Sequence, residues 1–174
     1  MTMQKKLKCY TIAGVIFTSI VGTLAHFTYE WTNENFLVGL FTPVSESTWE
    51  HMKLLFFPMF LYGVFICARL SQEYPCLAYA YPLGILAGTF AIPVLFYTYS
   101  GILGRTYTPI DILIFYISVI LAFSIVYIGT SRCRPKSPFL QKSSLILWLL
   151  VFLMAIAFMV FTVYAPSLGI FQVG

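Results

Sequence analysis

The chain has 174 residues, of which 60% are hydrophobic and only 9% are charged. Soluble domains carry about 25% charged residues, so water is not the main solvent of this chain, and a separate soluble catalytic domain is excluded. The net charge of +4 is read as a membrane-topology signal, and we expect no nucleic-acid partner.

Five apolar runs are each long enough to cross a bilayer, whose hydrocarbon core needs about 20 helical residues. They cover residues 9–29, 54–70, 76–99, 109–129 and 145–164. Three lysines precede the first run, but no small-residue cleavage site follows it, which favours a retained helix over a signal peptide. The sequence therefore predicts an all-α integral membrane protein with one membrane domain, residues 1–174, in contact with the lipid bilayer.

A polar segment, residues 31–53, joins the first two spans and contains the turn-forming residues Asn33, Gly39 and Pro43. Ser45 and Ser47 are both candidate N-caps for the second long helix, and either choice leaves a carboxylate in the first helical turn. We therefore expect a short polar or amphipathic connection that leads directly into this helix.

Lysine and arginine side chains are unevenly divided between the two sides of the predicted bundle. If the N-terminus is cytoplasmic, the inner side holds Lys5, Lys6, Lys8, Arg69, Arg132, Arg134, Lys136 and Lys142, and the outer side holds Lys53 and Arg105. Because positively charged loops are retained in the cytoplasm, we expect the N-terminus inside and the C-terminus outside a bacterial-type plasma membrane. The acidic residues show the opposite distribution, with only Glu73 on the inner side.

The four cysteines all map to the cytoplasmic half in this orientation: Cys9, Cys67, Cys76 and Cys133. Thiols stay reduced in the cytoplasm, so we expect no structural disulfide.

His26 and Glu30 lie four residues apart near the outer end of the first span and share a helix face. An unsatisfied ring nitrogen in hydrocarbon is costly, so His26 requires a partner. A neighbouring carboxylate or carbonyl is the simplest one, and intramembrane ionisable residues are also candidate functional residues.

Glu46 and Glu50 are also four residues apart, and two carboxylates on one helix face repel each other unless a cation, a proton or a base lies between them. His51 follows Glu50 and points in another direction around the helix, so it reaches the same point only if the site lies between helices. Asp111 comes soon after Pro109, where a first-turn acid is favoured by the helix dipole, and it is a further candidate ligand.

These side chains form a candidate metal site at the outer surface. Two imidazoles with several carboxylates suit zinc, manganese or iron better than calcium or magnesium, and zinc is our first expectation. The predicted metal ligands are His26, Glu46, Glu50, His51 and Asp111, the predicted general bases are Glu46 and Glu50, and the supporting residues are Glu30, Asn35, Lys53 and Arg105. A metal-dependent membrane hydrolase acting on a lipid or another small amphiphile is the corresponding enzyme hypothesis, although the spacing matches no strict motif such as HExxH.

Two alternatives use the same residues. Carboxylates and histidines also relay protons or hold a cation in transporters and channels. The inner half offers few ionisable residues, so transport by this chain requires oligomerisation or an inner route lined by hydroxyls and backbone. In the second alternative, Lys53 and Arg105 neutralise the acids of a structural or partner-binding outer cap that holds no ligand.

The stretch from Pro43 to Lys53 reads P-V-S-E-S-T-W-E-H-M-K, and it is preceded by His26-Phe27 and followed by Pro58. It resembles a family of small bacterial multi-pass membrane proteins of unassigned activity with the motif P-V-[NS]-E-S-x-W-E-H-x-K. The resemblance implies that Glu46, Glu50, His51 and Lys53 belong to the family pattern, and it implies no substrate.

We also expect the tail, residues 166–171, to fold back over the outer polar site.

Overall fold

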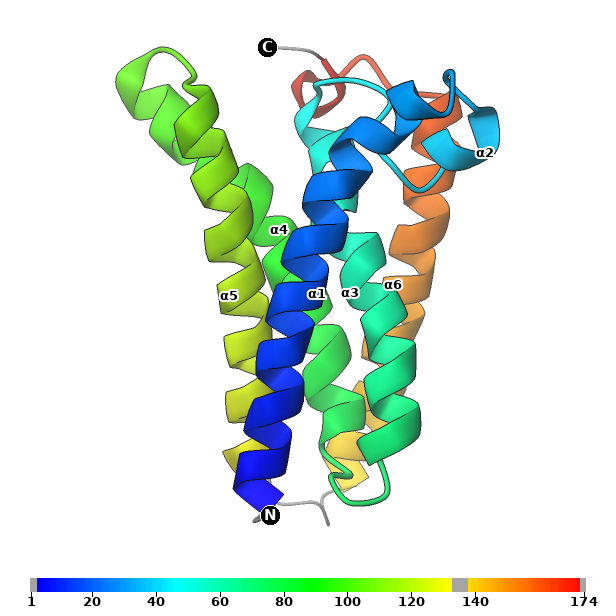
Figure 1. Cartoon of the computed structure of the whole chain (residues 1–174), viewed down its shortest axis with the longest axis vertical. Helices are drawn as coiled ribbons and strands as arrows, with labels where there is room; N and C mark the ends of the chain where they lie inside the picture. Colours follow the sequence, from blue (N-terminus) through cyan, green and yellow to red (C-terminus); the bar gives the residue numbers. More distant parts are fainter. Residues whose placement is uncertain (1–2, 133–137, 173–174) are drawn as a thin grey trace.

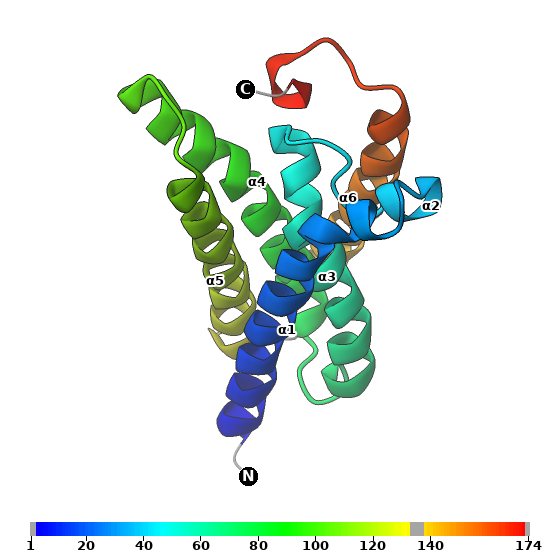
Figure 2. The same ribbon diagram turned by 45° about the horizontal axis from the view of Figure 1, so that its top comes forward.

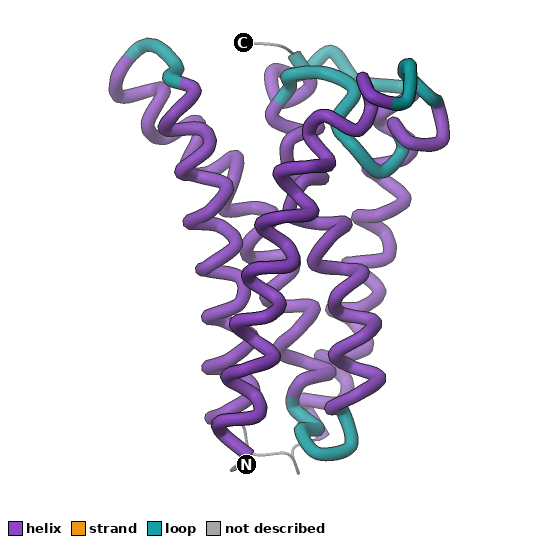
Figure 3. The backbone as a smooth tube through the Cα atoms, in the orientation of Figure 1, coloured by secondary structure: helices purple, strands orange, loops and turns teal. Residues whose placement is uncertain are grey.

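The structure is a computed structural model that describes residues 3–132 and 138–172. Within these residues the chain is helical and contains no strand (Figure 3). The elements in chain order are α1 (Met3–Trp31), α2 (Phe36–Gly39), α3 (Thr48–Leu70), α4 (Leu77–Leu103), α5 (Thr108–Arg132), α6 (Pro138–Val163) and the 3-10 helix η1 (Gly169–Phe171). The N-terminus lies at one end of the bundle, and α2 and the C-terminal tail lie at the other (Figure 1).

In the part of the chain that the structure describes, five helices are long and apolar enough to cross a membrane: α1, α3, α4, α5 and the Lys142–Val163 part of α6. The all-helical fold and the five candidate spans are therefore confirmed, and the chain is built as a multi-pass membrane protein. The helix α3 begins at Thr48, six residues before its apolar run at Leu54, because Ser47 is the N-cap. The motif residues from Glu50 to Lys53 are therefore helical.

The helices α3 and α4 occupy the middle of the bundle. The helix α3 contacts α1, α4 and α6, while α4 also contacts α5 and α6, and α1 packs against α5 (Figure 2). The outer surfaces of α1, α5 and α6 expose large apolar side chains, for example Ile20, Leu121 and Phe152. In water such surfaces are unfavourable, but they suit contact with lipid tails.

Three prolines, Pro58, Pro82 and Pro93, lie inside α3 and α4, and each removes one main-chain donor. The carbonyl of Ala78, four residues before Pro82, accepts hydrogen bonds from Ser144 Oγ at 2.7 Å and from Trp148 Nε1 at 2.9 Å. The freed carbonyl therefore joins α4 to α6, as expected where a neighbouring helix satisfies the backbone that a proline leaves unpaired.

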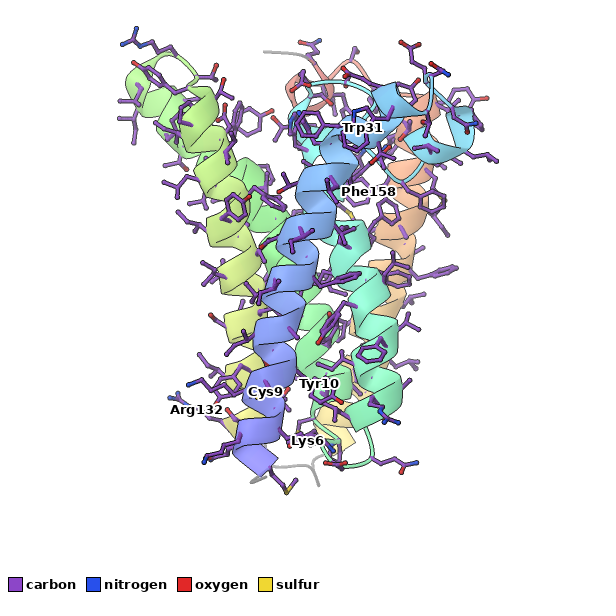
Figure 4. The ribbon with its side chains drawn as sticks, viewed as in Figure 1. Lys6, Cys9, Tyr10, Trp31, Arg132 and Phe158 are labelled. Carbon is purple, nitrogen blue, oxygen red and sulfur yellow. The ribbon has the colours of Figure 1, made fainter. Side chains whose placement is uncertain are left out.

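The two ends of the bundle carry different side chains. Lys6 and Arg132 lie near one end and Trp31 near the other (Figure 4), and Lys6 Nζ lies 2.5 Å from Glu73 Oε1 in an exposed ion pair. Cys9 is a free thiol, whereas Cys76 at the start of α4 is disulfide-bonded. The prediction that no disulfide forms is therefore wrong, because pairing depends on which cysteines the fold brings together.

The C-terminal tail returns to the bundle and packs against aromatic side chains of α3 and α6 (Figure 2). The ring of Phe171 in η1 lies 4.9 Å from the Trp49 ring and 5.5 Å from the Phe161 ring, measured between centroids. Trp49 belongs to the first turn of α3 and is 8% exposed. The tail therefore covers the beginning of α3, next to the polar motif.

Candidate metal centre

The first part of the site is the end of α1 opposite the N-terminus, which stops in a hydrogen-bonded turn. The Glu34 amide donates to the Tyr29 carbonyl at 3.0 Å, and the Asn33 amide donates to the Glu30 carbonyl at 3.1 Å. Asn33 has a φ of 51° and Glu34 a φ of 58°, so both are left-handed, as such a C-terminal motif requires. His26 stands just over one turn before this end.

The connection from α1 to α3 contains its own short helix. The Asn35 side chain accepts hydrogen bonds from the amides of Leu37 at 3.0 Å and Val38 at 3.4 Å, and so caps α2. Asn35, predicted as a supporting residue, therefore holds the connection in shape.

The start of α3 fixes the orientation of His51. The Ser47 hydroxyl accepts the Glu50 amide at 3.4 Å, while the Ser47 carbonyl oxygen lies 2.9 Å from His51 Nδ1. A carbonyl only accepts, so Nδ1 of His51 carries a hydrogen, which leaves Nε2 as the atom that could bind a metal. Histidines that bind metals commonly donate their other ring N–H to a carbonyl in this way.

Glu46 lies immediately before this helix and faces both imidazoles. Its Oε2 is 3.3 Å from His51 Nε2 and its Oε1 is 3.9 Å from His26 Nε2, and the two rings lie 5.3 Å apart between centroids. One potential ligand atom from each residue lies within 4.8 Å of the others. The structure therefore brings three of the five predicted ligands together, from α1, the connection and α3.

The cluster opens to the surface through Glu46. This side chain is 68% exposed, whereas those of His26 and His51 are 31% and 30% exposed. The His26 Nδ1 atom is buried and has no hydrogen-bond partner among residues 3–132 and 138–172. His26 is thus placed by its helix and by ring contacts, including an edge-on contact with Phe27 at 5.1 Å.

Glu50 and Lys53 form a separate, buried network beside the cluster. Lys53 Nζ lies 2.7 Å from Glu50 Oε2 and donates to the carbonyls of Gly39 at 3.0 Å and Thr42 at 3.4 Å. The Glu50 carboxylate also accepts the Val44 amide at 3.0 Å. Glu50, predicted as a ligand and a base, therefore contacts Lys53 and the connection.

Asp111 lies in the first turn of α5, near the connection from α4. It accepts a hydrogen bond from the Tyr99 hydroxyl, which in turn accepts the Tyr107 amide at 3.1 Å. Arg105 stacks over the Tyr107 ring at 4.7 Å. In the described chain, the metal-ligand group does not include Asp111, and Glu30 is exposed in the last turn of α1.

Thr162 is a residue that sequence reasoning missed. Its hydroxyl lies 2.5 Å from Lys53 Nζ and 3.3 Å from Glu50 Oε1. A threonine in an apolar run carries no signal of such a role, because its importance comes from the packing of α6 beside α3.

The cluster offers the donor types of a metal site, and its spacing can be compared with that of bound zinc. Ligand atoms bound about 2.0–2.2 Å from a tetrahedral zinc ion lie about 3.3–3.6 Å from one another. The 3.3 Å separation between Glu46 Oε2 and His51 Nε2 meets this requirement. His26 Nε2 lies 3.9 Å from the other carboxylate oxygen, and one ligand atom from each residue lies within 4.8 Å of the others, so the three side chains would have to move closer together around an ion. Two imidazole nitrogens and one carboxylate oxygen leave a fourth position for water or substrate.

Residues 1–174 match a family whose description is "Family of unknown function (DUF6512)". The chain has no match among curated proteins or solved structures.

Proposed function

Because the chain belongs over its whole length to a family of unknown function (DUF6512), we propose its function from geometry: it binds a divalent metal through His26, Glu46 and His51. The observation that carries the proposal is the convergence of these residues from three separate segments, with His51 Nε2 turned toward the Glu46 carboxylate by the Ser47 carbonyl. Zinc is the expected ion, because it accepts mixed imidazole and carboxylate ligands.

A simple ion pair explains the cluster less well. One carboxylate can neutralise one imidazolium, but Glu46 faces two imidazoles whose ring centroids are 5.3 Å apart. An ion pair with the carboxylate therefore uses only one of the two rings. A metal ion uses both, because each neutral imidazole can bind it.

Hydrolysis of a lipid-like substrate is the chemistry that the open fourth position favours. A zinc ion lowers the pKa of a bound water, and the resulting hydroxide is itself a nucleophile. The cluster lies near the end of α1 that carries Trp31, and tryptophan is enriched at membrane interfaces. We place this end on the extracytoplasmic side of a plasma membrane, on the basis of the lysine and arginine distribution.

Transport is the second candidate, and one observation favours it. The hydroxyls of Thr18, Thr89 and Ser118, on α1, α4 and α5, are buried and have no hydrogen-bond partner within the described residues. Such hydroxyls suit a polar inner route. Zinc entry into proteoliposomes that contain a fluorescent zinc indicator would favour transport, whereas zinc binding without entry would favour the hydrolase.

Metal analysis of purified protein tests the proposal. After zinc loading and removal of excess ion, we expect about one zinc per chain in the wild type and strong loss in His26→Ala and His51→Ala. Glu34→Gln is the matched control, because it removes an exposed acid from the same end of the molecule. Equal zinc content in the wild type and His51→Ala, or none in either, would refute the proposed site.

A further inference from the structure

The buried ion pair of Lys53 and Glu50 contacts groups outside its own helix. Lys53 is 0% exposed and Glu50 is 3% exposed, although the two side chains belong to the polar motif at a helix start. Lys53 Nζ contacts the Glu50 carboxylate, two carbonyls of the connection and the Thr162 hydroxyl of α6. Each charge is therefore both paired and hydrogen-bonded, which a buried ion pair needs in order to be tolerated.

The contacts of this pair hold the backbone that precedes Glu46. Lys53 holds the carbonyls of Gly39 and Thr42, and Glu50 holds the amide of Val44. Only Ser45 separates Val44 from Glu46, and on its other side Glu46 is followed by the helix cap Ser47. The backbone around Glu46 is thus anchored from both directions.

Glu46 itself lacks the burial that would keep its carboxylate in place. Its side chain is 68% exposed, and its partners are the two histidines. Exposed ion pairs contribute little and hold their side chains weakly. The position of this carboxylate between His26 and His51 must therefore come from its backbone.

We infer that Glu50, Lys53 and Thr162 form a positioning network that sets the metal affinity of the site by holding Glu46 between the two histidines. The inference rests on the proposed metal site. Glu50 then acts through Glu46, and Thr162 connects the last long helix, α6, to the coordination geometry. Hydrogen-bonded partners of metal ligands commonly change metal affinity by about 10–100-fold when they are removed.

Three variants test the network. Thr162→Val removes the hydroxyl and keeps the side-chain shape, and the double variant Glu50→Gln with Lys53→Met removes both charges together, so that no unpaired charge is left buried. A third, Glu73→Gln, breaks the exposed Lys6–Glu73 pair at the opposite end and serves as the control. Zinc affinity is measured by titration in nanodiscs, together with the absorption spectrum of bound cobalt(II), the thermal midpoint without metal and amide hydrogen exchange of residues 39–47.

We expect about tenfold weaker zinc binding in the double variant, a smaller loss in Thr162→Val, altered cobalt spectra and faster exchange in residues 39–47. The control should match the wild type in every measurement. Unchanged affinity and spectra in a folded double variant would overturn the inference while the proposed metal site stands. If the wild type binds no zinc, the proposed metal site and the positioning network are both rejected. Loss of binding only in His51→Ala would support the metal site and reject the network.

Discussion

Ser47 supports the site in two ways that can be separated at the scale of one residue. Its hydroxyl caps α3 by accepting the Glu50 amide, and its carbonyl fixes the ring of His51. The first contact belongs to the side chain and contributes to helix stability, whereas the second belongs to the main chain and is present with any residue at this position.

Replacement of Ser47 by alanine should therefore lower stability without abolishing zinc binding. We expect a loss of about 1 kcal/mol from the missing helix cap, measured by denaturant unfolding in detergent micelles. Zinc titration of the same protein should give an affinity close to that of the wild type, because the acceptor for His51 Nδ1 remains. Loss of zinc binding in a folded Ser47→Ala protein would contradict this division of roles.

The effect of pH on the site distinguishes a bound metal from an ion pair. A metal binds only neutral imidazole, so acidification should weaken zinc binding and remove the stabilisation that zinc confers. An ion pair between Glu46 and His51 requires the protonated ring, so acidification would not weaken it in the way that it weakens zinc binding.

We therefore expect the increase in thermal midpoint caused by zinc to shrink between pH 7.5 and pH 5.5 in the wild type. The variant His51→Ala should show little zinc-dependent increase at either pH. A midpoint that rises on acidification in the same way with and without zinc would favour the ion-pair explanation.

At the scale of helices, the site depends on close packing between α1 and α3. A Cβ atom added at Gly22 would lie 2.4 Å from the Leu54 carbonyl oxygen and 2.7 Å from the Phe115 ring. That carbonyl lies four residues before Pro58, which has no amide hydrogen to donate to it. Gly22 and His26 are one turn apart on α1, so this contact also sets how close His26 comes to α3.

Replacement of Gly22 by alanine should force α1 and α3 apart. We expect a loss of about 1–3 kcal/mol, typical of overpacked cores, together with weaker zinc binding. Gly101→Ala is the matched control, because a Cβ there meets nothing within 4 Å, and its stability should equal or exceed that of the wild type. Thermal unfolding and zinc titration of both variants would check this. Equal stability and zinc affinity in the two variants would show that the close contact at Gly22 determines neither property.

The helices could be predicted from the sequence because each apolar run is a local property. The start of α3 could not, since Ser45 and Ser47 offer similar caps and only the structure selects Ser47. With this choice Glu46 precedes the helix. The expectation that Glu46 and Glu50 share a helix face is therefore wrong. The grouping of Glu46 with His51 was predicted, whereas the link of Glu50 to Thr162 depends on the packing of α6.

The predicted site residues that converge belong to α1, to α3 and to the connection between these two helices. His26, Glu46 and His51 lie within 26 positions of one another in the sequence, so the α1–α3 pairing alone brings them together. Asp111 comes from a different helix pair, and its contact with Tyr99 lies between neighbouring helices of that pair. The order of the helices did not show that Asp111 would lie apart from the two histidines.

At the scale of the whole molecule, two indicators of orientation disagree. The lysine and arginine distribution predicts that the end that carries the N-terminus faces the cytoplasm. The helix α4 begins at this same end (Figure 1). Cys76, its N-cap residue, is disulfide-bonded, and disulfides persist mainly in oxidising compartments. We give the charge distribution more weight, because it comes from many side chains and acts directly during membrane insertion.

This orientation predicts which engineered thiols a membrane-impermeant maleimide reaches in intact cells. In a Cys9→Ser background, Glu34→Cys should react without permeabilisation, because residue 34 is exposed and follows the end of α1 that this orientation places outside. Lys5→Cys, at the opposite end of the bundle, should react only after the membrane is opened. The reverse pattern would place the metal centre on the cytoplasmic side and reject extracytoplasmic hydrolysis. It would leave the proposed coordination by His26, Glu46 and His51 intact, because that coordination depends on the helix pairing alone.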